Sequence, residues 1–428
     1  MLVLYLLALV AVALVVWRML LPADLRLNRR FLARFLKDSA GRGPSKVKLA
    51  RVARWLPHSE IEEHVYYQVE AEYSDGSQQQ ATVQVLYPLE SLQRQREQKT
   101  IIAADLDLMQ NPENLLSTQT STEPGEKFKE DPLRELTAER KLIEQKAAQF
   151  DREIEQLRHL NACTVLFPRL IAYDRAQHIA LLGPLGVDRL DKVLHHGSAD
   201  ERLRLLENFL TTLAAFHEGC ANLALSFPSR GAHNEQVVRR QLGEAIETLG
   251  EAGVLSAETS HQQILESTSP LWTAGADYVG PRLADASPRG LYVFSGEVRP
   301  LDYGRLRRDI SLLDVVELLC DPAMPLAVAE ELALMKHYLS ARFAAVDEAR
   351  AAERNMLRLA VYYRIVLAGH LTRHFCALKE TPREKRGALA IPYWTPAASH
   401  RNLEALQLYL GQETELASLK NLLCPRGR

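Results

Sequence analysis

The stretch LADASPRGLYVFSGEVRPLDYGRLRRDISLLDVVE, residues 283–317, decides the expected fold. Its pattern predicts a loop that carries Asp285, followed by a β-hairpin over 291–301 with its turn at Ser295-Gly296. A hairpin brings its own ends together, so Asp285 and Asp302 are expected to lie near each other at the open end. Paired carboxylates suit phosphoryl transfer, in which one orients the acceptor hydroxyl and another holds magnesium. Two aspartates that only make turns would give the same spacing.

The same stretch resembles the catalytic core of the protein-kinase-like fold, in the branch of aminoglycoside and choline phosphotransferases. The resemblance makes Asp285 the candidate catalytic base and Asp302, in Asp302-Tyr303-Gly304, the candidate magnesium ligand. It also implies ATP and Mg²⁺ as cofactors. Two positions differ from the family, because its histidine two residues before the catalytic aspartate is Leu283 and its magnesium-binding asparagine five residues after is Gly290.

Composition excludes several classes of protein. The chain has 428 residues, a formal net charge of −2 and 47% hydrophobic residues, which is typical of globular proteins. This balance does not suit a chain that coats nucleic acid, and no nucleic-acid partner is expected. The five cysteines are scattered and form no Cys-x-x-Cys motif, which disfavours a zinc site or a disulfide framework and favours a reducing compartment.

The N-terminal residues predict a membrane anchor. Residues 1–21 are apolar apart from Arg18, and a membrane-spanning helix needs about 20 such residues. No basic residue precedes the run and a basic segment follows it, which favours an anchor over a cleaved signal peptide. The positive-inside rule then places the N-terminus outside and the rest of the chain in the cytoplasm. We therefore expect a single-pass protein of a bacterial inner membrane.

The next segment, residues 22–45, is basic and contains a predicted amphipathic helix over 25–37. The apolar face of this helix is formed by Phe31, Leu32, Phe35 and Leu36. Two arrangements fit it equally well. Either the helix lies along anionic lipid headgroups, or it packs its apolar face on the domain that follows.

Residues 46–182 are expected to form an antiparallel β-lobe. Strand patterns cover 46–56, 63–73 and 78–87. The last two flank the turn Ser74-Asp75-Gly76-Ser77, a strong hairpin signal because Asp-Gly adopts the positive φ angles of a tight turn. The polar stretch at about 108–132 is typical of a mobile insertion.

The segment Gly183-Pro184-Leu185-Gly186 follows two more predicted strands, 166–174 and 177–182. It resembles the hinge between the lobes of the kinase-like fold, where backbone groups bind adenine. Gly183 and Leu185 are therefore candidate cofactor contacts. Glycine and proline at these positions are equally typical of a plain turn.

Parts that hold ATP phosphates in this family are missing. A predicted helix resembles the family's C helix and carries Glu153, a candidate cofactor-site residue, at the position that pairs with a strand lysine. The strand 81–86 contains no lysine, and Gln84 is the nearest occupant. The connection 57–61 has no glycine through which a backbone could approach phosphates closely. With Gly290, three of the usual parts are absent.

Residues 183–428 are expected to form a helical lobe that contains the catalytic-like hairpin, 283–304. Apolar periodicity predicts helices over 200–217, 233–265, 324–343 and 355–375. His217 is interpreted as a helix-end residue rather than a catalytic one. Arginines in or beside the last helix are expected to face solvent or lipid, namely Arg354, Arg358, Arg364 and Arg373. The expected fold class is thus α+β, a bilobal kinase-like fold behind one transmembrane helix.

Three functions fit these observations. The first is a phosphotransferase that uses ATP and Mg²⁺ to modify a small-molecule, lipid-linked or protein hydroxyl, with Asp285 as base. The second is a pseudokinase, a membrane-anchored cytoplasmic scaffold that binds or regulates a protein partner. The third is an assembly factor whose fold serves only as a surface. The missing phosphate-binding parts favour the pseudokinase. Because Asp285 and Asp302 are both retained, an active phosphotransferase stays the alternative.

Overall fold

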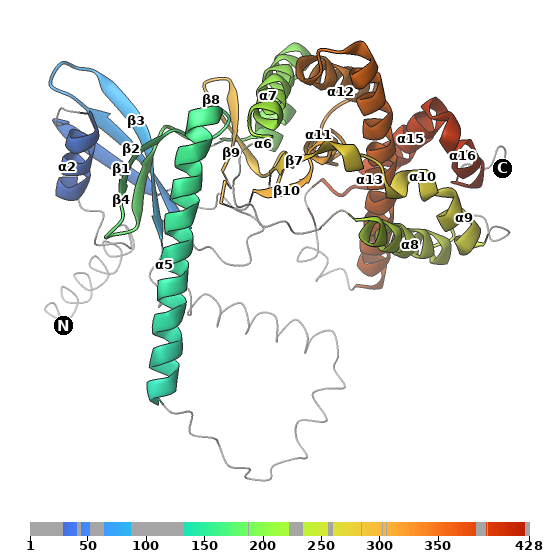
Figure 1. Ribbon diagram of the computed structural model, residues 1–428, viewed down its shortest axis with the longest axis horizontal. Coiled ribbons are helices and arrows are strands. Elements are labelled where there is room, and N and C mark those ends of the chain that lie inside the picture. The colour runs from blue at the N-terminus through green and yellow to red at the C-terminus, as the bar shows by residue number, and fades with distance from the viewer. Residues whose placement is uncertain are drawn as a thin grey trace, which may run out of the picture. The chain divides into compact units, whose positions relative to one another are not determined.

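The computed structural model describes residues 29–40, 44–51, 64–86, 132–186, 188–221, 234–255, 260–283, 285–301, 303–304, 306–381, 391 and 393–423. The chain divides into two compact units. The first comprises Met1–Glu155 and Arg169–Leu185, and the second comprises Gln156–Pro168 and Gly186–Arg428. The first unit holds the largest sheet and the second holds most of the helices (Figure 1). The domain ranges expected from the sequence stay predictions.

The first unit is built on a five-stranded antiparallel sheet in the order β1-β2-β3-β5-β4 (Figure 1). Its strands are β1 (Lys46–Arg51), β2 (His64–Glu72), β3 (Gln78–Leu86), β4 (Leu170–Asp174) and β5 (Ile179–Leu182). All five overlap strands predicted from the sequence. The predicted hairpin joins β2 to β3, and Gly76 in its turn has a φ of 78°, a conformation that a residue without a Cβ adopts at little cost.

Helix α2 (Arg29–Ala40) packs on this sheet (Figure 1). The shared core cluster includes Leu32 and Leu36 of the helix and Tyr67, Val69, Val83, Val85, Ile179 and Leu181 of the strands. The aromatic residues Phe31 and Phe35 are partly buried against the same cluster. The apolar face predicted for this helix therefore covers the sheet, so it is not the face that would lie along lipid headgroups.

Helix α5 (Pro132–Cys163) contains the segment that resembles a C helix, and its residues up to Glu155 belong to the first unit. Asp151 fastens it to the β4–β5 hairpin. The Asp151 carboxylate accepts hydrogen bonds from the Tyr173 hydroxyl and from Arg175 Nε, the latter at 2.9 Å, and lies 3.2 Å from His178 Nδ1. Three groups of one hairpin thus hold the helix in place.

The predicted membrane placement needs correction. Among the residues that the structure describes, no helix is both long and apolar enough to cross a bilayer. The expectation of a single-pass membrane protein is therefore not supported. The predicted anchor, residues 1–21, lies outside the described residues, as do the connection 57–61 and the predicted insertion up to residue 131.

The second unit contains two small sheets. One has the strand order β6-β8-β9, with β6 (Asp188–Arg189), β8 (Leu291–Phe294) and β9 (Glu297–Pro300), and the other pairs β7 (Val279–Arg282) with β10 (Arg307–Ile310). The hairpin predicted in the opening stretch is confirmed as β8–β9. Its turn residues Ser295 and Gly296 have φ angles of 50° and 80°, as in the two-residue turns that match the twist of a hairpin.

The helices of this unit surround the small sheets and extend to the C-terminal end (Figure 1). They are α6 (Leu190–His196), α7 (Ala199–Gly219), α8 (Glu235–Glu251), α9 (His261–Ser267), α10 (Ser269–Trp272), α11 (Leu312–Leu319), α12 (Val328–Arg342), α13 (Val346–Glu380), α15 (Pro396–Gln412) and α16 (Ala417–Leu423). The helical stretch predicted over 233–265 contains two helices, α8 and α9. The first ends before Gly253, which has a φ of 70°, and glycine in this conformation commonly terminates helices.

Arg364 of α13 is buried, so its expected position facing solvent or lipid is wrong. Its side chain is 2% exposed and pairs through Nη2 with Glu331 of α12. Nη1 donates to Asn402 Oδ1 of α15 at 3.0 Å, and the guanidinium lies 5.2 Å from the ring centre of Tyr409. Helix α13 contacts α8, α11, α12 and α15, and the partners of Arg364 on α12 and α15 enclose its side chain.

Replacing Arg364 with alanine should destabilise the second unit by about 3–5 kcal/mol, because Glu331 would stay buried without its partner. Arg354→Ala is the matched control, since this arginine lies on the exposed side of the same helix and its loss should cost less than about 0.5 kcal/mol. Urea unfolding followed by circular dichroism measures both. Equal effects of the two substitutions would contradict the buried role of Arg364.

Candidate functional site

The loop over residues 285–290 carries the candidate base. Asp285 is exposed, and its Oδ1 accepts a hydrogen bond from the Ser287 N–H at 2.8 Å. The Gly290 N–H in turn donates to the Ser287 carbonyl at 2.9 Å. A Cβ at residue 290 would lie 2.7 Å from both Cγ and Oδ2 of Asp285. The carboxylate therefore occupies the space that a side chain at position 290 would need, so the glycine at this position allows the observed placement of Asp285.

A buried ionic cluster holds the backbone just before this loop. The Asp314 carboxylate of α11 accepts hydrogen bonds from the Leu283 N–H at 2.9 Å and from Arg282 Nε at 3.2 Å. Arg282 also pairs with Asp309 at 3.0 Å and with Glu317. Burial opposes the charge of Arg282, but the surrounding carboxylates raise its pKa above the usual value. One guanidinium therefore organises three acidic side chains behind the loop.

His217 at the end of α7 joins the same cluster. It is fully buried, with Nδ1 2.7 Å from the Tyr338 hydroxyl and Nε2 3.1 Å from Asp314 Oδ2. Burial lowers the pKa of His217, although Asp314 acts in the opposite direction. The side chain connects α7 to α11 and α12, a structural position that agrees with its interpretation as a helix-end residue.

A second group of side chains supports the loop, and sequence reasoning missed it. Asp191 of α6 is completely buried and pairs with Arg189, with its two oxygens 3.0 and 2.6 Å from Nε and Nη2. Its Oδ2 also accepts a hydrogen bond from the Tyr393 hydroxyl at 2.8 Å, and its N–H donates to the Pro288 carbonyl at 3.1 Å. Tyr393 has a φ of 70°, a strained value for a bulky residue. Its partner lies 202 residues away in sequence, beyond the reach of any local pattern.

Asp321 approaches the loop from the end of α11. Its Oδ2 lies 3.8 Å from Arg289 Nη2, and its Oδ1 accepts a hydrogen bond from the Ala323 N–H at 2.7 Å. Burial raises the pKa of Asp321 to about 6. The Ala323 N–H and Arg289 oppose this rise, whereas the carboxylates of Asp285 and Asp191 add to it. Asp321 is therefore a buried acid that responds to the charge of the candidate base.

The raised pKa of Asp321 gives a pH-dependent prediction. Its folded value of about 6 exceeds the unfolded value of about 3.9, so its contribution to stability is complete below pH ~4 and lost as pH rises through 6. Asp321→Asn should therefore stabilise the protein by about 1–3 kcal/mol at pH 8, with a smaller gain as pH falls toward 4. Denaturant unfolding at several pH values measures the difference. Asp188→Asn, at an exposed position, is the control, and a gain independent of pH would contradict the assignment.

The hinge-like segment has its backbone donors engaged within the first unit. The Leu185 N–H donates to Thr82 Oγ1 of β3 at 3.1 Å, in a buried position. The Gly183 N–H donates to the Arg169 carbonyl at 2.6 Å, and Pro184 has no N–H. The groups through which Gly183 and Leu185 would donate to adenine are thus bonded inside the chain.

Gln84 and Glu153, the residues expected at the positions of a strand–helix ion pair, are both buried, with exposures of 1% and 7%. Gln84 pairs in register with Tyr66 of β2 and Ala180 of β5, which establishes its strand position. Gln149 Nε2 donates to Glu153 Oε1 at 2.9 Å within α5. The buried strand β3 thus carries a neutral amide, that of Gln84, at the position where a phosphate-binding lysine is expected.

Several site predictions remain open. Asp302 lies outside the described residues, so its role as magnesium ligand and its approach to Asp285 stay predictions. Strand pairing of Leu291 with Pro300 does bring the two ends of the hairpin together. The roles of Asp285 as base and of Gly183, Leu185 and Glu153 as cofactor contacts also stay predictions.

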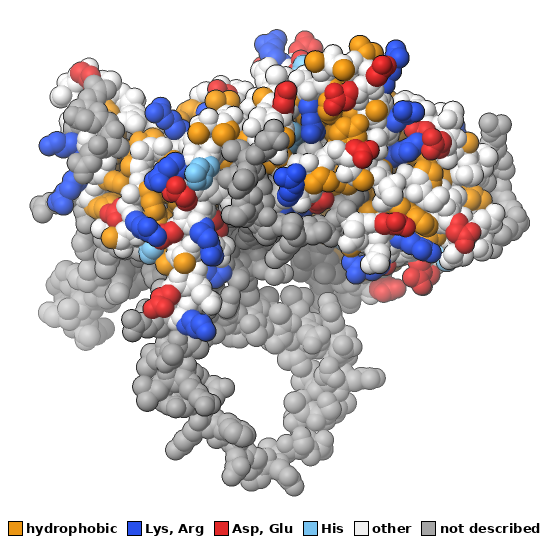
Figure 2. Space-filling view, in the orientation of Figure 1, with side chains coloured by type: hydrophobic (Ala, Val, Ile, Leu, Met, Phe, Trp, Pro, Cys, Tyr) orange, Lys and Arg blue, Asp and Glu red, His pale blue; other side chains and the backbone are white. Residues whose placement is uncertain are grey.

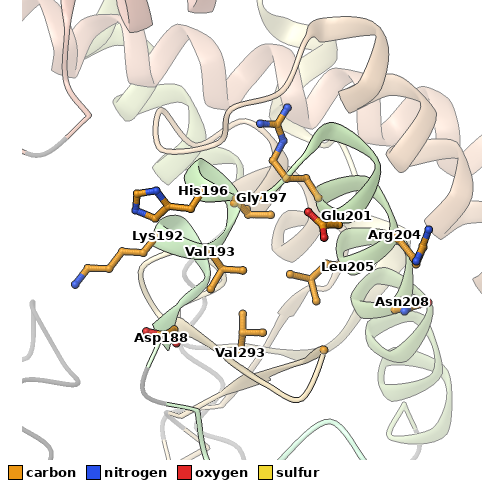
Figure 3. Close-up of a pocket in the computed structure, with 13 residues that line it drawn as sticks. Asp188, Lys192, Val193, His196, Gly197, Glu201, Arg204, Leu205, Asn208 and Val293 are labelled. Atoms are coloured by element: carbon orange, nitrogen blue, oxygen red, sulfur yellow. The ribbon is translucent and has the colours of Figure 1, made fainter.

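A groove of about 690 Å³ lies elsewhere on the second unit, bounded by α6, α7 and the β8–β9 hairpin (Figure 3). Figure 3 shows Val193, Leu205 and Val293 pointing into it, whereas Lys192 and Arg204 point away from its centre. The floor is thus apolar and the charges lie at the rim. This arrangement does not suit a phosphate or metal site, which needs charged groups directed inward.

No protein-family model matches the chain, and no curated protein is similar to it in sequence. Similar solved structures include an ADP-bound aminoglycoside phosphotransferase, with 12% identity, a TM-score of 0.37, and coverage of 91% of this chain and 99% of that chain. A choline kinase from Cryptosporidium parvum has 10% identity, a TM-score of 0.40, and coverage of 92% and 99%. A microcompartment-associated aminopropanol kinase has 14% identity, a TM-score of 0.39, and coverage of 88% and 95%.

The names of these structures are those of the phosphotransferase branch that the sequence resembles. The predicted mixed α+β class is confirmed by the sheets and helices of the chain itself. No activity of this chain follows from similarities at this level.

Proposed function

We propose that this chain is a kinase-like scaffold that binds a protein partner and lacks ordinary phosphotransferase activity. The observation that carries the proposal is the buried hydrogen bond from the Leu185 N–H to Thr82 Oγ1. Adenine could use this donor only after the Thr82 bond is broken. Leaving a buried polar group without its partner costs about 1–3 kcal/mol, which alone would weaken nucleotide binding by about tenfold or more.

The acidic and strand positions support the same conclusion. Phosphoryl transfer depends on charges placed around the phosphates and metal, with little other chemistry for the protein to supply. Gln84 brings no charge to its buried strand, and Gly290 has no side chain to bind magnesium. The Asp285 carboxylate is turned toward Gly290 and bonded to Ser287. These residues do not fit bound ATP and Mg²⁺, so no catalytic step is derived through them.

The surface supports a protein partner over a nucleic acid. Figure 2 shows basic and acidic side chains interspersed on one face, with hydrophobic side chains between them. Binding to a phosphate backbone would favour a continuous basic patch. Non-obligate protein interfaces are about as apolar as the rest of a protein surface, so a mixed surface of this kind is compatible with a protein partner.

Nucleotide binding gives the first test. The wild-type chain should show no saturable shift in melting temperature with ATP and Mg²⁺ up to about millimolar concentration, since the hinge donor is occupied. Thr82→Val removes the acceptor at nearly constant volume and should allow weak adenine-nucleotide binding. Thr212→Val is the control, because that hydroxyl bonds only its own helix at an exposed site. Wild-type ATP binding with a dissociation constant below about 0.1 mM would overturn the proposal.

Cell complementation gives the second test. Asp285→Ala should restore the function of a strain that lacks this protein as fully as the wild type does, because a scaffold needs no general base. The purified variant should also keep its melting temperature, since Asp285 is exposed. If the Asp285→Ala protein is well folded but completely fails to complement the strain, the result contradicts the scaffold and supports an enzymatic function.

That enzyme, an ATP- and magnesium-dependent phosphotransferase acting on a hydroxyl, is the second candidate. It is favoured by the exposed Asp285 on a loop that is supported on both sides. Asp314 holds the Leu283 N–H before the loop, and Asp321 faces Arg289 within it. ADP formation in the presence of mixed alcohol acceptors, lost in Asp285→Ala, would establish it.

A further inference from the structure

A second cavity, of about 350 Å³, lies within the second unit and is chemically unlike the groove. Its lining combines aromatic walls with charges of both signs and includes Gln241, Arg307, Asp309, Glu317, Tyr362 and Trp394. The volume falls within the range of small-molecule sites, which are mostly apolar with a few convergent polar groups. The candidate base Asp285 is not among its lining residues.

Arg307 is a cation of this cavity that is only loosely paired. Its Nε lies 3.6 Å from Asp309 Oδ2, an ion-pair distance that is too long for a hydrogen bond, and this buried atom has no hydrogen-bond partner within the described parts of the chain. Burial and repulsion from Arg282 lower the pKa of Arg307, whereas Glu317, Asp309 and Asp314 act in the opposite direction. Because the side chain is 27% exposed, a carboxylate on a ligand would reach the guanidinium and add a charge-assisted hydrogen bond.

Glu317 offers the complementary group. One of its oxygens, Oε1, pairs with Arg282 at the back of the cavity. The side chain is 28% exposed, so it is open to a ligand from the cavity side. An ammonium group in the cavity would therefore face two carboxylates, those of Glu317 and Asp309, because both residues line it.

The aromatic walls are fixed before any ligand arrives. The Tyr362 hydroxyl donates to Gln241 Oε1, which ties α13 to α8. The indole of Trp394 meets the His374 ring edge-on at 5.2 Å between ring centres. Rigid aromatic surfaces bind the apolar part of a ligand with little loss of side-chain freedom.

From this arrangement we infer that the cavity binds a zwitterionic amino acid with an apolar or aromatic side chain. Its carboxylate pairs with Arg307, its ammonium group with Glu317, and its side chain packs on Tyr362 and Trp394. A ligand with only a negative charge would face the two carboxylates, and one with only a positive charge would face two arginines. The inference goes beyond the proposed function, because it holds whether or not Asp285 transfers a phosphoryl group.

The same side chains would transmit occupancy to the loop of Asp285. Glu317 and Asp309 both pair with Arg282, and Arg282 directly precedes the Leu283 N–H that Asp314 holds. An ammonium group that draws Glu317 into the cavity therefore competes with Arg282 for it. The bound amino acid would act as a regulator of the scaffold.

Isothermal titration of the full chain with L-phenylalanine and L-leucine tests the inference. We expect saturable binding with a dissociation constant below about 1 mM. N-acetyl-L-phenylalanine lacks the ammonium group and L-phenylalaninamide lacks the carboxylate, so each should bind at least about tenfold more weakly. These two ligands test the charge pairing on the unaltered protein, without reliance on a variant.

Arg307→Gln should weaken L-phenylalanine binding by at least about tenfold. Arg308→Gln is the matched control, since it is the next residue of β10 and exposed, and it should leave binding unchanged. The inference is overturned by the absence of saturable binding of both amino acids up to about 10 mM, by equal binding of L-phenylalaninamide and L-phenylalanine, or by equal effects of the two substitutions. None of these readouts involves a nucleotide, so failure here and failure of the proposed function are separate results.

Discussion

The buried carboxylate of Asp314 is the constraint on which the second unit depends. It accepts the Leu283 N–H and Arg282 Nε, and it faces His217 Nε2. These donors come from the loop of the candidate base, from β7 and from α7, and they meet in a place that water does not reach. Hydrogen bonds to a charged group in such surroundings are strong when complete and costly when broken. The path of the chain into residue 285 is therefore fixed by α11, a helix that follows it in sequence.

The proposed function follows from a contrast between the well-bonded backbone before the loop and the candidate nucleotide-site groups of Asp285 and Leu185. In the second unit, buried acids bond the Leu283 N–H before the loop and face Arg289 within it, and Asp285 is bonded to its own turn. In the first unit, the N–H of the hinge-like Leu185 donates to Thr82. Each unit thus engages internally a group that nucleotide chemistry would need. A rigid surface is what a binding scaffold needs, because preorganisation reduces the entropy lost on association.

The sequence predicts the parts of this structure that local chemistry determines. Both hairpins follow from their turns, Asp75-Gly76 and Ser295-Gly296, since the positive φ angles of Gly76, Ser295 and Gly296 restrict the chain to tight-turn geometries. The apolar face of α2 is recognisable from its spacing, but periodicity does not say whether a sheet or a membrane receives it. The expected membrane placement itself found no support among the described helices. An amphipathic pattern predicts which face of a helix is apolar, but it does not predict whether protein or lipid covers that face.

The missed residues share a different cause. Arg364, Asp191 and Asp321 are charged residues in buried positions, and each contacts at least one polar group that is far away in the chain. A charged residue is predicted to face solvent unless its buried partner is known. Partners that are distant in the sequence are found only in the three-dimensional structure. For the candidate site, the positions of Asp285 and of the hairpin could be read from the sequence. The second group of acids around the loop could not.

Gly290 and the candidate base share one small space. A Cβ at residue 290 would lie 2.7 Å from Cγ and Oδ2 of Asp285, so any other residue there would require the carboxylate to turn aside. Asp285 is exposed, so this rotation costs little packing, but it breaks the hydrogen bond from the Ser287 N–H. The direction in which the acid faces is therefore coupled to the identity of residue 290, and a substitution at 290 would redirect the carboxylate without altering Asp285 itself.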